Sequence, residues 1–153
     1  MRRTMWGLLV VPCLAWTACT QNSSSSSSGG ADRGSLNAVV RGNFLDVELD
    51  ADTAPLSLAA TVTVEGSQVA GEAQLGAAAQ ARDLFKQRAT GSNAMRFVVS
   101  DSRALRIARS GVVVRIPLTS PPGRVQVSEV SASDEQGHNL PLRAFAGVPE
   151  SRP

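Results

Sequence analysis

The sequence predicts an all-β domain, a jelly-roll-type β-sandwich with one short helix, preceded by a signal peptide and a disordered linker. The first observation behind this fold class is that short segments alternate apolar and polar residues from about residue 36 onward. The second is that clusters of Gly, Pro, Asp and Ser separate these segments, as turns separate the strands of packed sheets. The third is that an apolar leader and a Ser/Gly run precede all of them.

Residues 1–18 have the features of an export signal peptide. Arg2 and Arg3 give a positive start, and "WGLLVVPCLAW" at 6–16 gives an apolar core of secretory length. Pro12 interrupts this core, which is too short to cross a hydrocarbon layer about 30 Å thick. We therefore expect an exported protein that this segment does not anchor as a transmembrane helix.

Cys19 directly follows that stretch, in the hexapeptide "LAWTAC". This hexapeptide resembles the lipobox of bacterial lipoproteins, in which the cysteine sulfur carries diacylglycerol and the cysteine becomes the new N-terminus. The resemblance implies lipidation of Cys19 and attachment to the membrane of the cell envelope through this lipid. Thr20 follows instead of Asp, which favours the outer membrane or cell surface. The alternative is an incidental Cys19 beside an ordinary cleavage site.

Residues 19–34 contain "SSSSSSGG" and are predicted to be a flexible, lipidated linker, because serine and glycine bury little apolar surface. Such a linker would hold a domain away from lipid headgroups. The sandwich is expected over residues 35–148, and residues 149–153 are expected to be a disordered tail.

Charge and cysteine content exclude several classes of protein. Without Arg2 and Arg3, the 15 basic residues fall to 13 and equal the 13 acidic ones, so we expect no nucleic-acid partner. Cys13 lies in the signal peptide and Cys19 directly follows it, so neither disulfides nor a cysteine metal site can stabilise the domain. Val, Leu, Ile and Ala must fill the core, and no cofactor is predicted.

Period-two alternation predicts strands over residues 45–50, 57–65, 67–75, 94–100, 104–108, 111–118 and 124–133. In the sixth segment Val112, Val114, Ile116 and Leu118 are expected on one face. In the seventh, the step from Val127 to Val130 is odd, which predicts a bulge or a strand that changes sheets.

Residues 76–89, "GAAAQARDLFKQRA", break this alternation and are rich in helix formers. Ala81, Leu84, Phe85 and Arg88 would share one helical stripe. We therefore expect a short helix or helical turn across one end of the sheets, closed by residues 90–93.

Three stretches, taken in order, resemble the cohesin-like domain, a jelly-roll sandwich related to certain carbohydrate-binding modules. They are "LDVELDADTAPLSLAATVTVEG", "ARDLFKQRATGSNAMRFVVSDSRAL" and "SGVVVRIPLTSPPGRVQVSEVSASDEQGHNLPL". The resemblance implies a non-enzymatic binding module that mediates protein–protein interaction or scaffolding. The expected partner is an unidentified envelope or secreted protein. The alternative is a carbohydrate-binding module for cell-surface or extracellular polysaccharide.

Aromatic content bears on these two alternatives. The chain has no Tyr, both Trp lie in the leader, and only four Phe are available to stack on sugar rings. Protein binding through a sandwich face is therefore the favoured hypothesis.

His138, the single histidine, follows a predicted type I turn from Asp134 to Gly137. A serine nucleophile with His138 as its base is one interpretation, but no Gly-x-Ser-x-Gly elbow accompanies it. An ordinary turn histidine is favoured, and no catalytic residue is predicted.

Four acidic residues, Asp46, Glu48, Asp50 and Asp52, alternate along one predicted strand face. Their oxygens are ligands of the kind Ca²⁺ takes, which makes them calcium candidates. The favoured interpretation is a solvated outer face that discourages edge pairing, with no metal.

Overall fold

The computed structural model describes residues 34–145. These residues belong to a single compact unit. The predicted signal peptide, Cys19, nearly all of the predicted linker and the predicted tail lie outside the described residues.

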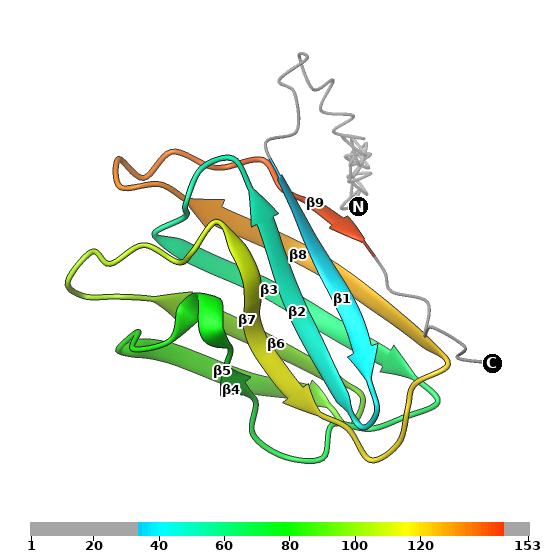
Figure 1. The fold of residues 1–153 in the computed structure, drawn as a ribbon. Coiled ribbons are helices and arrows are strands. Elements are labelled where there is room, and N and C mark those ends of the chain that lie inside the picture. Colours follow the sequence, from blue (N-terminus) through cyan, green and yellow to red (C-terminus); the bar gives the residue numbers. More distant parts are fainter. Residues whose placement is uncertain (1–33, 146–153) are drawn as a thin grey trace, which may run out of the picture. The chain divides into compact units, whose positions relative to one another are not determined.

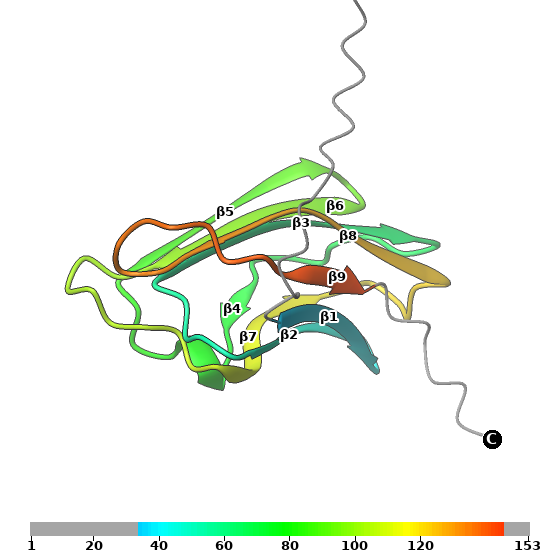
Figure 2. The same cartoon turned by 90° about the horizontal axis from the view of Figure 1, so that it is seen from above.

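Within residues 34–145 the chain forms nine strands and one short 3-10 helix, arranged as two sheets packed face to face (Figures 1 and 2). Sheet A has the strand order β4-β7-β2-β1-β9, and sheet B has the order β5-β6-β3-β8. The elements are β1 Gly34–Arg41, β2 Phe44–Ala51, β3 Ser57–Glu65, β4 Gln74–Leu75, η1 Ala77–Ala79, β5 Leu84–Gly91, β6 Ala94–Ser100, β7 Ser110–Pro117, β8 Arg124–Ser133 and β9 Arg143–Phe145. The predicted all-β sandwich is confirmed.

Sheet A joins the beginning and the end of the described chain. β1 and β2 form an antiparallel hairpin whose turn uses Gly42 at φ +61°, a left-handed conformation that glycine adopts without steric cost. β9 pairs with β1 in parallel and forms one edge of the sheet. Neither β1 nor β9 was among the strands predicted from the alternation.

The core lies between the two inner faces and consists of Val, Leu, Ile and Ala with few larger side chains. Phe97 from β6 is the largest fully buried side chain, and Leu36, Leu45 and Leu58 pack in the same cluster. Burial of each such side chain stabilises the fold by about 1.5–3 kcal/mol relative to exposure. The predicted aliphatic core is confirmed.

The register shifts in three strand pairs, and two of these shifts bear on the predicted strands. In β8 the pairing with β3 shifts between Ser128 and Ser131, where Glu129 has φ +49°, so the predicted irregularity is a bulge and the strand stays in sheet B. In β7 the shift falls at Val113, which is buried beside Val114. Val112 therefore pairs with the outward-facing Glu48, and its predicted place on the inner face is wrong.

The predicted helix over residues 76–89 is wrong for most of its length. Only η1, Ala77–Ala79, is helical, and residues 84–91 form β5 at the edge of sheet B. Edge strands bury little side-chain surface, and here both faces of β5 are largely exposed, so alternation is weak in the sequence. Residues 104–108 were predicted as a strand but form a loop that buries Ile107, and residues 67–75 form a strand only at β4.

Candidate functional site

The outer face of sheet B is the candidate functional site, and it is built from alternate residues of four neighbouring strands. Across its middle, Ala59 of β3 pairs with Val98 of β6, which pairs with Lys86 of β5. The next row along runs from Thr61 through Arg96 to Arg88. The face therefore has small side chains on β3 and longer, charged ones toward the β5 edge.

Two large apolar side chains on this face are exposed to solvent. Val98 is 38% exposed and Leu84 is 43% exposed. Leu84 pairs with Ser100, two residues from Val98, so the two side chains are diagonal neighbours on the same face. With Ala59 they form an apolar strip bordered by cationic residues.

The cationic residues are Lys86, Arg88 and Arg96, and the β5–β6 hairpin carries no acidic residue. Arg88 and Arg96 lie opposite each other across the strand pair, an arrangement of like charges that is unfavourable by itself. Arg96 binds Glu129, but none of the ion pairs within residues 34–145 involves Lys86 or Arg88. Two unpaired cations therefore remain at the edge of the apolar strip.

The bulge in β8 directs Glu129 over the centre of the face. Its carboxylate accepts a hydrogen bond from the Thr61 hydroxyl at 2.6 Å and another from the Arg96 guanidinium. The Thr61 hydrogen bond, with the charge of Arg96, lowers the pKa of Glu129 below its usual range. Glu129 is thus ionised at neutral pH and orients Arg96.

The outer face of sheet A contrasts with this one because its central charged residues, Asp46, Glu48, Arg41 and Arg115, are paired with one another. The Asp46 carboxylate accepts hydrogen bonds from Arg115 at 2.6 and 2.8 Å and from Arg41 at 2.7 Å. Arg41 also binds Glu48 at 2.7 Å, and the Arg115 guanidinium lies 5.6 Å from the centroid of the Phe44 ring. The charges at the centre of this face are therefore paired within the fold.

The calcium candidates do not come together as a set of oxygen ligands. Asp46 and Glu48 are both bound to Arg41, and Asp46 is fully buried beneath its arginines, which corrects the expected solvated face at that position. Asp50 and Asp52 are exposed farther along the chain. Within residues 34–145 no group of three or more His, Cys, Asp or Glu side chains is arranged to hold a metal ion.

His138 lies where the turn prediction put it. Gly137 N–H donates to the Asp134 carbonyl, and the Asp134 carboxylate accepts from the backbone N–H of Gln136 and His138. The His138 ring, itself 77% exposed, lies 3.2 Å from Asp134. No serine hydroxyl bonds this ring in the described part of the chain, so the residues of a nucleophile and base are not assembled here.

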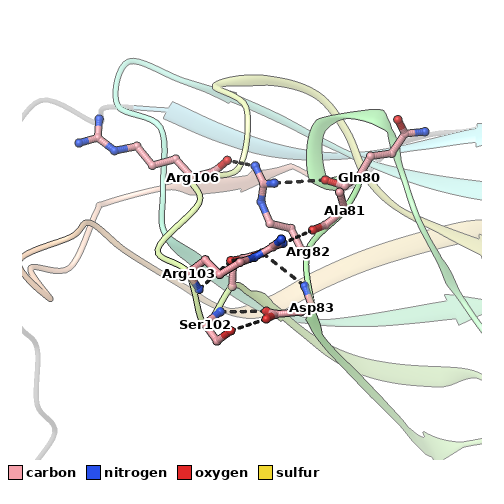
Figure 3. A network of polar contacts seen from close by, with 8 residues as sticks. Gln80, Ala81, Arg82, Asp83, Ser102, Arg103 and Arg106 are labelled. Atoms are coloured by element: carbon pink, nitrogen blue, oxygen red, sulfur yellow. Dashed lines mark hydrogen bonds and ion pairs between the residues drawn. The ribbon is translucent and has the colours of Figure 1, made fainter.

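A polar network fixes the loops at one end of the sandwich. Asp83 accepts hydrogen bonds from the Ser102 backbone and hydroxyl, while Arg82 donates to the carbonyls of Gln80 and Arg106 (Figure 3).

Asp101 belongs to the same loop pair and is bound by Arg103 through both of its carboxylate oxygens. The Arg103 side chain, more than any other group, lowers the pKa of Asp101 to about 2. The network joins residues 80–83 to residues 101–106, and most of its polar groups are bonded within it, whereas Arg82 Nε is buried without a hydrogen-bond partner among the described residues.

Sequence reasoning missed the candidate face because it assigned Leu84 and Arg88 to a helix, whereas they alternate with Lys86 on one strand face. The signal that was present was the period-two spacing of Leu84, Lys86 and Arg88.

No helix within residues 34–145 has the length and hydropathy that a membrane span needs.

Comparison with known proteins identifies the fold. No family model and no curated protein matches the chain. Among solved structures, a non-cellulosomal cohesin from the archaeon Archaeoglobus fulgidus matches with a TM-score of 0.63 at 14% identity, covering 75% of this chain and 88% of that one.

Two further matches are cohesins of scaffoldins. The sixth cohesin of Acetivibrio cellulolyticus scaffoldin B, solved in complex with a Cel5 dockerin mutant, has a TM-score of 0.63, 13% identity, and coverage of 77% of this chain and 99% of that chain. A type III cohesin module from the ScaE cell-surface anchoring scaffoldin of Ruminococcus flavefaciens has a TM-score of 0.57, 14% identity, and coverage of 80% and 94%. The described residues of this chain therefore have the cohesin fold.

Proposed function

We propose that this chain is a non-enzymatic, lipid-anchored envelope protein whose sandwich binds another protein through the outer face of sheet B. One observation carries the proposal: the exposed apolar strip of Leu84 and Val98 adjoins Lys86 and Arg88, which have no ion-pair partner in residues 34–145. A cohesin of the same fold was solved with a dockerin bound, which supports protein binding as the use of this architecture.

The charges of the face indicate what kind of partner fits it. The outer face of β5 and β6 carries three cationic residues, Lys86, Arg88 and Arg96. Glu129 forms an ion pair only with Arg96. A complementary partner presents carboxylates opposite the β5 edge and apolar side chains opposite Val98. Such rim charges raise the association rate and select the partner, while buried apolar contacts provide most of the affinity.

The size of the face indicates a modest interface. Four strands spaced about 4.8 Å apart, with about eight residues each, cover roughly 500 Å². Stable complexes commonly bury about 800 Å² on each partner. A long-lived complex would therefore have to bury the adjoining loops as well as this face. A complex that buries this face alone would be transient.

The anchor in this proposal is the lipid on Cys19, which lies outside the described residues. Its support is the hexapeptide "LAWTAC" after an apolar leader, together with the serine run that follows. Several acyl chains, at about 0.8 kcal/mol per buried CH₂, would hold the protein stably at the outer membrane or cell surface. A Cys19→Ala variant should accumulate as unprocessed precursor. Normal processing and membrane attachment of that variant would contradict lipidation.

The binding proposal is tested by charge reversal on the candidate face. The tagged full chain is incubated with envelope extract of the source organism, and the captured protein is quantified against increasing extract. We expect saturable capture by the wild type and at least a tenfold loss in Lys86→Glu/Arg88→Glu. Arg109→Glu is the matched control, because Arg109 is exposed on a loop away from the face.

Equal capture by the double variant would rule out this face. The absence of any saturable partner for a folded wild type would rule out the function.

Carbohydrate binding is the second candidate function. Of the four Phe, Phe97 is buried and Phe85 packs against the core, whereas Phe44 and Phe145 are exposed on sheet A. Arg115 already covers the Phe44 ring, so Phe145 is the better platform for a sugar ring. Retention on insoluble polysaccharide that is lost in Phe145→Ala would favour this stacking mode over the protein-binding face.

A further inference from the structure

A polar cleft lies where three loops meet at one end of the sandwich. It is lined by residues 66–68 after β3, 92–93 between β5 and β6, and 119–120 after β7, and it is largely open to solvent, with a volume of about 540 Å³. We call it the loop cleft. Its volume is within the range of about 300–1,000 Å³ that small-molecule sites occupy.

Hydrogen bonds between the loops hold this cleft in shape. The Val69 N–H donates to the Ser92 carbonyl at 2.9 Å, and the Thr119 N–H donates to the Gln68 carbonyl at 2.9 Å. The Ser67 hydroxyl, nearly buried, donates to the Ser120 carbonyl at 2.6 Å. Because the three loops are bonded to one another, the cleft exists before any ligand binds, and ordering it costs little.

The lining of the cleft is polar but uncharged. All seven lining residues are Gly, Ser, Thr, Asn or Gln. The side chains of Gln68, Ser92 and Asn93 make no hydrogen bond within residues 34–145, whereas the hydroxyls of Ser67 and Thr119 bond across the loops. Two amides and one hydroxyl are thus free to serve both as donors and as acceptors.

The cleft is also at the end of the sandwich remote from Gly34, where the described chain begins. β1 runs from Gly34 toward the β1–β2 turn, and the Asn43 carbonyl in that turn accepts from the Leu118 N–H, next to the cleft. Eight residues of strand span about 25 Å. The cleft and Gly34 therefore lie at opposite ends of β1.

We propose that the loop cleft binds a neutral saccharide through hydrogen bonds. An ionic ligand would find no opposite charge among the lining side chains, and an apolar ligand would find no large apolar side chain there. A saccharide presents hydroxyls that both donate and accept, as amides and hydroxyls do. The inference rests on the second candidate function, carbohydrate binding, and adds the loop cleft as a sugar site separate from Phe145.

Affinity is set by a few neutral hydrogen bonds that replace bonds to water. Each neutral bond contributes about fivefold to binding, and no aromatic ring adds stacking. The dissociation constant is therefore on the order of 1 mM for a single site.

The test uses the ¹⁵N-labelled full chain in phosphocholine micelles, a detergent without a sugar headgroup. Cellohexaose, xylohexaose, maltohexaose, mannohexaose and chitohexaose are titrated while the backbone amide resonances are recorded. We expect at least one of them to shift the amides of Gln68, Ser92 and Asn93 saturably. Gln68→Ala and Asn93→Ala should each weaken that binding at least fivefold, while Phe145→Ala should change it less than twofold.

Two outcomes overturn the proposal: no hexasaccharide shifts the cleft amides, or the shifts depend on Phe145 and not on Asn93. The Lys86→Glu/Arg88→Glu variant separates the two functions, because it should lose the protein partner and keep saccharide binding. Unchanged amide spectra elsewhere in each variant verify that it has folded.

Discussion

Asp46 offers the sharpest test of how sheet A is stabilised, because its carboxylate is fully buried on an outer sheet face. Arg115 donates to both carboxylate oxygens, at 2.6 and 2.8 Å, and Arg41 adds a third bond at 2.7 Å. These contacts join β1, β2 and β7. The change Asp46→Asn keeps the shape of the side chain, removes its charge and leaves one amide N–H₂ facing two guanidinium groups.

The magnitude follows from the burial of each partner. Hydrogen bonds to charged groups are worth about 1.5–3 kcal/mol each, and breaking a fully buried ion pair costs about 3–5 kcal/mol. Arg115 and Arg41 remain 46% and 51% exposed, so water solvates them once the carboxylate charge is gone. We therefore expect the free energy of unfolding to fall by about 2 kcal/mol. For a domain of this size the unfolding midpoint then falls by roughly 8–10 °C.

The assay is urea unfolding of the full chain, followed by circular dichroism at neutral pH. Asp50→Asn is the matched control, because Asp50 lies on the same strand but is exposed, and its change should stay within about 0.5 kcal/mol. If Asp46→Asn and Asp50→Asn destabilise equally, the buried ion pair does not stabilise the sheet and the reasoning is refuted.

The pH dependence of stability tests the contribution of the Asp46 charge in a second way. The hydrogen bonds from Arg115 lower the pKa of Asp46 in the folded protein. A carboxyl with a depressed folded pKa stabilises the fold above its unfolded pKa and loses that contribution as pH falls through the folded value. The difference between wild type and variant should thus be constant near neutral pH and shrink below about pH 4.

Three further changes test individual contacts that stabilise the fold. Gln87→Ala removes the side-chain amide that pairs with both backbone groups of the buried Ala73, at 2.6 and 3.2 Å, and should lower the free energy of unfolding by about 2 kcal/mol in urea titrations. Gly76→Ala places a Cβ 2.2 Å from the Val112 carbonyl oxygen, so it should destabilise by at least about 2 kcal/mol, seen as a lower thermal midpoint. Asp101→Asn should flatten the loss of stability between about pH 4 and pH 2, because the folded pKa of Asp101 is about 2 and its contribution disappears over that range.

Each of these three has an outcome that would count against it. Gly71→Ala meets nothing closer than 3.9 Å, so equal effects at Gly71 and Gly76 would show that crowding is not the cause. If a Gln87→Glu variant is as stable as the wild type, the hydrogen bond that the Gln87 amide donates to the Ala73 carbonyl does not contribute to stability. If Asp101→Asn loses as much stability between about pH 4 and pH 2 as the wild type does, a group other than Asp101 is responsible for that loss.

The strands that sequence alone predicts are those with one face firmly in the core. β2, β3 and β6 alternate cleanly because every second side chain, such as Leu45, Val62 or Phe97, is buried. The inner face of β7 was misassigned at Val112 because a bulge at Val113 shifts the register by one residue. Nothing in a run of three valines marks which of them is the extra residue.

Other elements depend on tertiary pairing that local sequence does not encode. β9 is three exposed residues that become a strand only by pairing with β1. β5 has helix-forming residues but is recruited as the edge of sheet B by β6. The cationic edge of the candidate face lies on β5, so it was missed together with that strand. The loop cleft was missed because its three loops meet only in the folded chain.

The most direct test of the central claim is a titration of the captured partner against the full chain and its Val98→Asp variant. Val98 is 38% exposed at the centre of the candidate face, so a carboxylate there is tolerated by the fold but desolvated in a complex. Leu105→Asp, at a loop residue 42% exposed, is the matched control. We predict that Val98→Asp binds the partner at least tenfold more weakly than the wild type, and that Leu105→Asp binds it as tightly as the wild type. The affinity of the wild type should fall as the salt concentration rises. Wild-type affinity in Val98→Asp would contradict the assignment of partner binding to sheet B.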